Sequence, residues 1–214
     1  FRKLAERSDR DADILADLEK AAASSSLVEA IRSWLVRTPI QGSMAGDAGD
    51  EEAVQNFVDD YLSCQAKLAD AAIGRLAAQG VQDMSAVQGR FDAAAAGARE
   101  FLMPDGKVDR ARAGLLFIES YRELPLLAWP RTLVDAVVEL EESMLLWRNA
   151  HARMVERIIG RRVGTGGSSG VDYLDATTRY RIFIDLWAVR TLLIKKEALP
   201  ELKNPSFYGF SGEA

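Results

Sequence analysis

The sequence has very little cysteine and histidine: Cys64 and His151 are the only examples among its 214 residues. A lone cysteine excludes a disulfide within the chain and is typical of a reduced, cytoplasmic protein. With one residue of each kind, the chain also lacks the three or four His and Cys ligands of an ordinary zinc site. Its longest apolar runs fall far short of the roughly 20 residues needed to cross a bilayer, so no membrane-spanning helix is predicted.

Basic residues are not concentrated in any segment. The formal net charge is −5, and Lys and Arg are interspersed with Asp and Glu along the chain. This pattern argues against nucleic acid or a membrane surface as the partner. The apolar fraction of 48% and the charged fraction of 28% are ordinary for a soluble globular protein. We therefore expect a single domain over residues 1–214, and because it begins with Phe1 we expect a processed, nicked or incomplete product.

What the sequence does contain is helical periodicity. Apolar side chains recur at three- and four-residue spacing, and no stretch alternates as a strand would. Ser26 and Glu29 stand in the capping-box relation at the start of the first clear helix. The predicted helices run from Ser26 to before Pro39, from the end of a loop at 39–50 to about Gly80, and over 84–102, 109–123, 132–159 and 173–194. A turn at 104–106 and a proline-bounded connector at 125–130 separate them. The predicted fold class is all-α, a helical bundle with one long helix followed by a glycine-rich loop.

His151 lies inside the long predicted helix, on an apolar face. Its apolar neighbours there are Trp147, Met154, Val155 and Ile158. A core histidine that is hydrogen-bonded to a neighbour is the more common reason for such a residue, and spacing alone favours metal ligation less. A haem, however, needs only one axial imidazole, so a lone histidine is compatible with haem and poorly compatible with most other metals. Three carboxylates are predicted to lie on the solvated side of the same helix: Glu139, Glu141 and Glu142.

Residues 160–170 (GRRVGTGGSSG) contain five glycines and are predicted to form a loop. A flexible linker is the simplest interpretation. A phosphate-binding loop is disfavoured, because the G-x-x-x-x-G-K-[ST] pattern is missing and no strand precedes the segment. Glycines also permit close approach of the backbone to a ligand, to which Thr165 and Ser168 would offer hydroxyl groups. No Ser–His–Asp triad or paired-carboxylate site can be built from the sequence.

The run from Trp147 to Leu174, WRNAHARMVERIIGRRVGTGGSSGVDYL, resembles the signature of the tryptophan 2,3-dioxygenase family. In that family a helical W-R-x-x-H-x-x-M-V-x-R-x-x-G segment leads into G-T-G-G-S-S-G. The similarity covers most of the chain and is weakest between Gly42 and Arg90. The other segments that resemble the family are 26–39, 113–125, 180–194 and the Phe1–Arg2 pair.

The resemblance implies a haem-dependent dioxygenase. Such an enzyme inserts O2 into the indole C2–C3 bond of L-tryptophan and gives N-formylkynurenine. The resemblance also implies that His151 is the axial ligand of the iron of haem b. The other haem contacts that it implies are Trp147, Phe1 and Arg2. The substrate contacts that it implies are Gly164 and Thr165.

Two parts of the family's active site have no counterpart in the chain. The distal histidine and the arginine that binds the substrate carboxylate both precede the position that corresponds to Phe1. The chain is therefore expected to be the C-terminal part of a larger enzyme, with the N-terminal part of the same enzyme as its partner. The resemblance further implies a homo-oligomer, by analogy a tetramer, and a cytoplasmic location.

Two alternatives to the dioxygenase stay open at this point. A haem monooxygenase that acts on a tryptophan derivative would share His151 and the glycine-rich loop. A non-catalytic helical interaction module would keep the fold without binding haem. Haem content separates this module from either enzyme, and the number of oxygen atoms transferred separates the two enzymes.

Overall fold

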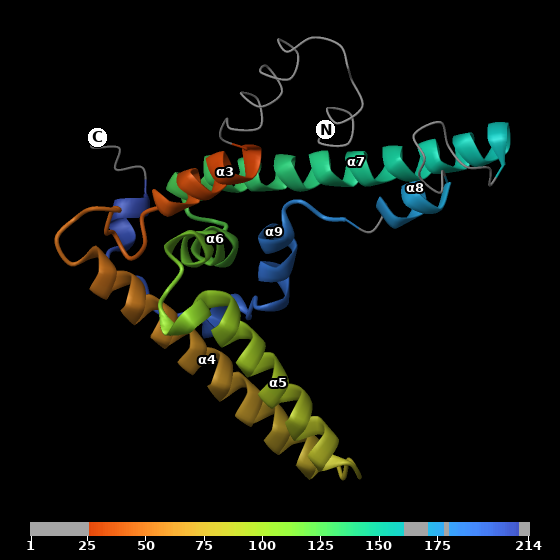
Figure 1. Cartoon of the computed structure of the whole chain (residues 1–214). Coiled ribbons are helices and arrows are strands. Elements are labelled where there is room, and N and C mark those ends of the chain that lie inside the picture. The colour runs from red at the N-terminus through yellow and green to blue at the C-terminus, as the bar shows by residue number, and fades with distance from the viewer. Residues whose placement is uncertain (1–25, 161–170, 178–179, 210–214) are drawn as a thin grey trace.

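A computed structural model of the chain describes residues 26–160, 171–177 and 180–209 (Figure 1). Within these ranges the protein consists of α-helices and short 3₁₀ turns, with one isolated β-bridge between Ile40 and Ser43. The predicted all-α fold class is thereby confirmed. Among the described helices, none combines the length and the apolar character required to span a membrane.

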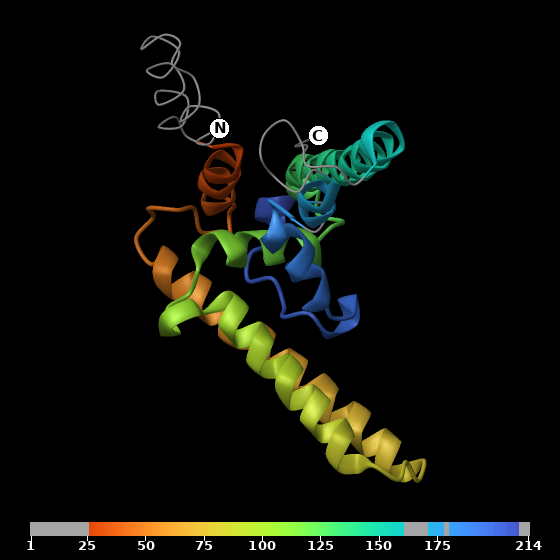
Figure 2. The ribbon, with the colours of Figure 1, turned by 45° about the vertical axis from the view of Figure 1, so that its right-hand side comes forward.

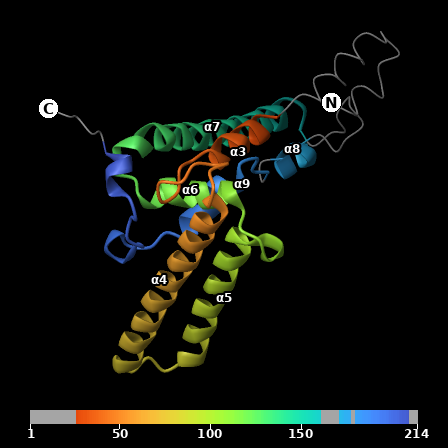
Figure 3. The same ribbon diagram turned by 90° about the vertical axis from the view of Figure 1, so that its left-hand side faces the viewer.

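Two helices of the body cross at a glycine. Helix α3 (Leu27–Val36) begins with the predicted capping box, in which both hydrogen bonds between Ser26 and Glu29 form. Helix α6 (Arg110–Ser120) lies below α3 in the view of Figure 3. A Cβ atom at Gly114 of α6 would stand 2.5 Å from the carbonyl oxygen of Leu35. Glycine at this position therefore permits the close approach of α3 and α6.

Helices α4 (Asp50–Ala78) and α5 (Met84–Leu102) form a long antiparallel hairpin that projects from the body (Figure 3). Their bounds agree with the prediction to within two residues. Only the root of the hairpin is buried, and its buried residues are Asp50, Val54, Phe57, Val58, Tyr61, Ala98 and Leu102. The hairpin is joined to α6 by an ion pair between Asp50 and Arg110, with 2.9 Å between Oδ2 and Nε.

Helix α6 is the centre of the core. Eight of its eleven residues are buried. The ring of Phe117 lies 4.6 to 5.4 Å from three other aromatic rings, those of Phe57, Tyr121 and Tyr208. The hydroxyl groups of three tyrosines then fasten the C-terminal segment and the loop after α3: Tyr61 donates to Leu192 O, Tyr121 to Pro200 O and Tyr208 to Pro39 O.

Helix α7 (Ala128–Ile159) is the long helix that carries His151. It begins four residues before the predicted start, and only Pro125–Leu127 remains as a 3₁₀ connector. The prediction was wrong because Pro130 was taken as a boundary. Proline is tolerated in the first helical turn, where the backbone N–H groups have no partner within the helix. The predicted end is confirmed: Gly160 has φ of 63° and terminates the helix.

The predicted helix over 173–194 is wrong. Helix α8 (Val171–Thr177) lies beside the end of α7, and the shorter α9 (Ile184–Ala188) continues into a 3₁₀ turn (Figure 1, Figure 2). Between them, backbone groups at 180–183 bond to side chains of α7 instead of forming helical bonds. Arg148 donates to the carbonyl of Tyr180, and Glu141 accepts from the N–H groups of Ile182 and Phe183. Because side chains of α7 form hydrogen bonds with these backbone groups, the segment does not need to be helical.

Candidate functional site

His151 and Trp147 form a stacked pair on α7. Their ring centroids are 5.3 Å apart and the ring planes are within 3° of parallel. The spacing of four residues places both side chains on one face of the helix. Trp147 is 65% exposed and His151 is half-buried, so the pair faces outward. The His151 ring is only partly buried, and no described residue forms a hydrogen bond or ion pair with it.

The helix face around this pair is apolar and exposed. Beyond Val137 only Glu141 and Ala152 of α7 are buried. The large apolar side chains that α7 exposes over the same stretch are Leu140, Leu146, Trp147, Met154, Ile158 and Ile159. An apolar face around His151 was predicted and is confirmed. An exposed patch of this kind is expected where a ligand or another polypeptide covers the surface.

Glu141 is the functional candidate that the sequence reasoning placed wrongly. Glu139 and Glu142 are exposed as predicted, but Glu141 is only 1% exposed. Its carboxylate accepts hydrogen bonds from Ile182 N–H, Phe183 N–H and the indole Nε1–H of Trp187. The available signal was its position on one helical face with Arg148 and Ala152, seven and eleven residues later; Arg148 bonds to the returning chain and Ala152 is buried.

The far end of α7 is held to the chain that returns beside it. Arg148 Nη1 donates to the carbonyl of Tyr180 over 2.9 Å. Arg153 forms ion pairs with Asp175 of α8 and with Glu156 on its own helix. Arg148 lies on the side of α7 that carries Glu141 and Ala152, since it follows Glu141 by seven residues. On the His151 face, Trp147 and Met154 remain largely exposed, and His151 itself is half-buried.

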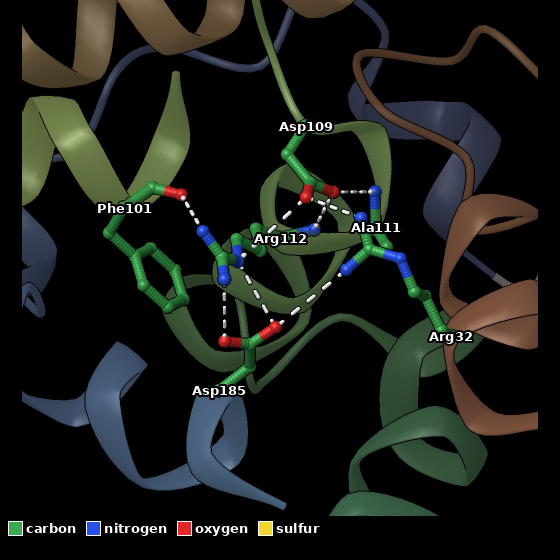
Figure 4. A network of polar contacts seen from close by, with 6 residues as sticks. All are labelled: Arg32, Phe101, Asp109, Ala111, Arg112 and Asp185. Carbon is green, nitrogen blue, oxygen red and sulfur yellow. Dashed lines mark hydrogen bonds and ion pairs between the residues drawn. The ribbon is translucent and has the colours of Figure 1, made fainter. Parts of the chain in front are cut away.

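A second polar cluster connects α9 to the core (Figure 4). Arg112 donates to Asp185 through Nε over 3.1 Å and to the carbonyl of Phe101 through Nη1. Asp109 caps α6 by accepting from the N–H groups of Ala111 and Arg112, and it also pairs with Arg32 of α3. Burial alone would raise the pKa of Asp109, but the hydrogen bonds from Arg32 and from the backbone outweigh burial and lower it. An apolar cavity of about 240 Å³ adjoins this cluster, and none of its lining residues belongs to α7.

The chemistry of the His151 face fits a haem. A haem requires one strong axial protein ligand and apolar contact with its flat ring system. The partly buried imidazole, the indole parallel to it and the neighbouring Met154 supply these features. They do not fit an ion that needs several protein ligands, since the described residues contain no group of three His, Cys, Asp or Glu side chains placed to hold one.

Four of the predicted site residues have no described position. Phe1, Arg2, Gly164 and Thr165 lie outside the described residues, as does the glycine-rich loop beyond Gly160. Of the predicted haem contacts, His151 and Trp147 are brought together. Both belong to α7, so their neighbourhood follows from helical spacing alone.

The fold and the site define a class: an all-α protein whose longest described helix presents a single imidazole on an exposed apolar face. The sequence profile of tryptophan 2,3-dioxygenase matches residues 3–193. The chain thus belongs to the tryptophan 2,3-dioxygenase family.

Several relatives with established names share this sequence pattern. A tryptophan 2,3-dioxygenase-like protein of Xanthomonas campestris is 46% identical over 203 residues, which are 89% of this chain and 73% of the relative. Tryptophan 2,3-dioxygenase 2 of Ralstonia nicotianae is also 46% identical, over 91% of this chain and 55% of its own length. The mouse tryptophan 2,3-dioxygenase is 29% identical over 90% of this chain and 48% of its own length. The chain therefore spans about half the length of the latter two relatives.

Proposed function

We propose that this chain is the haem-ligating, C-terminal part of an enzyme that converts L-tryptophan to N-formylkynurenine with O2. The observation that carries the proposal is His151, which stands at the family's histidine position and on an exposed apolar face beside a parallel indole. The names of the relatives supply the reaction class. The chain covers only about half the length of two of these relatives. This coverage supports the proposal that the rest of the active site lies on a preceding N-terminal part.

In this proposal the imidazole of His151 would hold the iron of haem b. The bound haem would supply the activation of O2, whose two atoms enter across the indole C2–C3 bond. Trp147 stacks on the imidazole and restricts the orientation of its ring. With the haem and the N-terminal part in place, the apolar side chains along this face of α7, Met154 among them, would keep water away from the His151 side of the iron. The N-terminal part would provide the distal groups and the arginine for the substrate carboxylate.

The remaining site residues enter the proposal through the family resemblance. Gly164 and Thr165 would contact the amino-acid end of the substrate, and Phe1 and Arg2 would lie near the haem. A homo-oligomer, by analogy a tetramer, is proposed on the same ground.

Labelled oxygen tests the reaction. The complete protein, loaded with haem and reduced, would be given L-tryptophan under ¹⁸O2, and the product would be analysed by mass spectrometry. Two labelled atoms in one product molecule support the dioxygenase. One labelled atom would favour the haem monooxygenase acting on a tryptophan derivative. Absence of turnover by haem-loaded, reduced protein would favour the non-catalytic interaction module.

Thr165 tests the proposed substrate contact. Because its hydroxyl would bond the ammonium or carboxylate of tryptophan, Thr165→Ala should lower kcat/KM by about tenfold, the loss expected for about 1.4 kcal/mol of binding. Haem content should stay unchanged. Thr165→Ser retains the hydroxyl and serves as the matched control. Equal kinetics for the unaltered protein and both variants would contradict this contact.

A further inference from the structure

Helix α7 leaves the core shortly before it reaches His151, and Glu141 marks the point of departure. Its buried residues on the core side are Val134 and Val137. From Val138 to Ile159 the buried ones are only Glu141 and Ala152, of which Glu141 is the nearer to the core. We infer that Glu141 is a positioning residue for His151: its buried carboxylate fixes the direction of the half of α7 that carries the imidazole. This inference rests on the proposed function.

The Glu141 carboxylate is held in a single geometry by three donors. Oε1 accepts from Ile182 N–H and from Phe183 N–H, the latter over 3.1 Å, and Oε2 accepts from the indole of Trp187. A carboxylate buried to this extent is tolerated only when such donors replace water. Any rotation of α7 about its own axis would break at least one of these bonds and leave a buried charge without a partner. The arrangement therefore resists movement more strongly than an apolar contact would.

The donors themselves belong to a firmly fixed segment. The guanidinium of Arg181 lies 4.2 Å from the centroid of the Trp187 ring. Leu186 and Val189 are buried in the core on either side of Trp187. Asp185 is joined to Arg112 of α6 through two nitrogen atoms of the guanidinium (Figure 4). Glu141 is thus the connection through which the central helix α6, by way of α9, determines the course of α7.

The length of helix between Glu141 and His151 amplifies any change in the direction of α7. Ten residues of helix correspond to about 15 Å along the axis, so a tilt of about 5° at Glu141 displaces the imidazole by about 1 Å. Displacements of that size are large for a ligand or catalytic group. Farther along, Arg148 bonds to Tyr180 and Arg153 pairs with Asp175 of α8, but α8 is itself held mainly by α7. Glu141 is the buried residue of this half of the helix that bonds to the segment anchored in the core.

Glu141→Gln tests the inference in the complete protein. The amide has the same shape as the carboxylate, but its NH2 group must face either the indole N–H or the two backbone N–H groups, so one bond becomes a repulsion. We expect haem binding weaker on the order of tenfold, as for other residues that orient a metal ligand. We also expect a shifted and broadened iron–histidine stretching band in the ferrous protein. Without haem, faster hydrogen exchange at the amides of Ile182 and Phe183 should report the loosened connection.

Two control variants separate positioning from general effects. Glu142→Gln makes the same charge change at the adjacent exposed position. Tyr208→Phe removes two hydrogen bonds, to Pro39 O and from Gly42 N–H, far from α7 in sequence and outside the Glu141 cluster. Both should keep the haem affinity and the iron–histidine band of the unaltered protein. Adding Trp187→Phe to Glu141→Gln removes the opposed indole donor and should restore part of the affinity.

The outcomes discriminate between this inference and the function on which it rests. If Glu141→Gln matches Glu142→Gln in affinity and spectrum, Glu141 does not position His151. The same conclusion follows if Tyr208→Phe weakens haem binding as much as Glu141→Gln does, because loss of stability then explains both. If the unaltered complete protein binds no haem through His151, the proposed function itself fails.

Discussion

Helices α6 and α7 differ in the fraction of their residues that is buried. Eight of the eleven residues of α6 are buried, whereas four of the thirty-two residues of α7 are. Helix α6 carries its apolar residues into a core shared with α4, α3 and the C-terminal segment. Helix α7 shares that core only through its first turns and then exposes a row of large apolar side chains around His151. The two helices therefore separate what stabilises the chain from what the chain offers to a ligand.

This separation has a physical reason. Burial of apolar area stabilises the fold, so residues that are already buried cannot also be available for a prosthetic group. The exposed face of α7 is costly in water, and a bound haem together with the rest of a larger enzyme would remove that cost. Substitutions on α6 should therefore change stability, and substitutions on the outer face of α7 should change ligand binding.

The largest expected effect comes from substituting one leucine on each of the two helices and comparing the free energies of unfolding. Leu115 on α6 is fully buried, and Leu146 on α7 is 71% exposed. Leu115→Ala should lower the free energy of unfolding by about 2–5 kcal/mol, because it leaves a cavity in the core. Leu146→Ala should change it by less than about 0.5 kcal/mol. Urea unfolding followed by far-ultraviolet circular dichroism measures both. Equal effects would contradict the division between the two helices.

Alkaline pH tests the core through its buried tyrosines. Burial raises the pKa of Tyr61, Tyr121 and Tyr208 above 10.0, for Tyr208 to about 12. The unfolded chain therefore loses tyrosine protons before the folded chain does. Stability from these hydroxyls is fully present below about pH 10 and is lost as the pH rises toward about 12. Tyr208→Phe should lessen the fall of the thermal midpoint over this range.

Tyr180 provides the control for the alkaline experiment. Its side chain is exposed, so Tyr180→Phe should leave the pH dependence of the thermal midpoint as it is in the unaltered chain. Ultraviolet absorbance of tyrosinate would report ionisation in the same samples. The account is contradicted if the buried tyrosines ionise before the chain unfolds.

Of the three tests (leucine substitution, alkaline pH and acid pH), acid pH is expected to change the stability least. Asp109 has a lowered pKa in the folded chain, so its ionised form stabilises the fold above the ordinary value of 3.8. That contribution is lost as the pH falls below 3.8 toward the folded pKa. Asp109→Asn keeps a helix-capping side chain but loses the charge that pairs with Arg32. It should therefore flatten the acid side of the stability profile, measured by urea unfolding at a series of pH values.

Asp105→Asn is the matched control for Asp109→Asn. Asp105 is exposed in the turn after α5, and its charge change should leave the acid side of the profile unaltered. Parallel profiles for the two variants would show that the Asp109–Arg32 contact does not contribute to stability.

Much of the fold could be predicted from the sequence because the deciding interactions are local. The capping box at Ser26, the loop before Asp50 and the glycine after Ile159 lie within a few residues of the boundaries that they set. Pro130 misled the prediction because the same residue suits both a connector and a first helical turn. The break at 180–183 could not be predicted, because it depends on Glu141 and Arg148, more than 30 residues earlier.

The candidate site divides in the same way. His151 and Trp147 could be predicted as neighbours, because four residues of helix bring them together. Glu141 could not, because acidic residues at positions 139, 141 and 142 look alike in sequence and only packing against Trp187 distinguishes one of them. A side chain that accepts hydrogen bonds from backbone N–H groups far along the chain can be recognised only from the folded structure.

The axial role of His151 is the central claim, and a haem titration of the complete protein tests it most directly. The unaltered protein should bind haem stoichiometrically with a Soret band of a histidine-ligated iron. His151→Ala should lose this binding and keep its far-ultraviolet circular dichroism, because the core around α6 does not include His151. A His151→Ala variant that binds haem with the same stoichiometry and an unchanged Soret spectrum would contradict the claim.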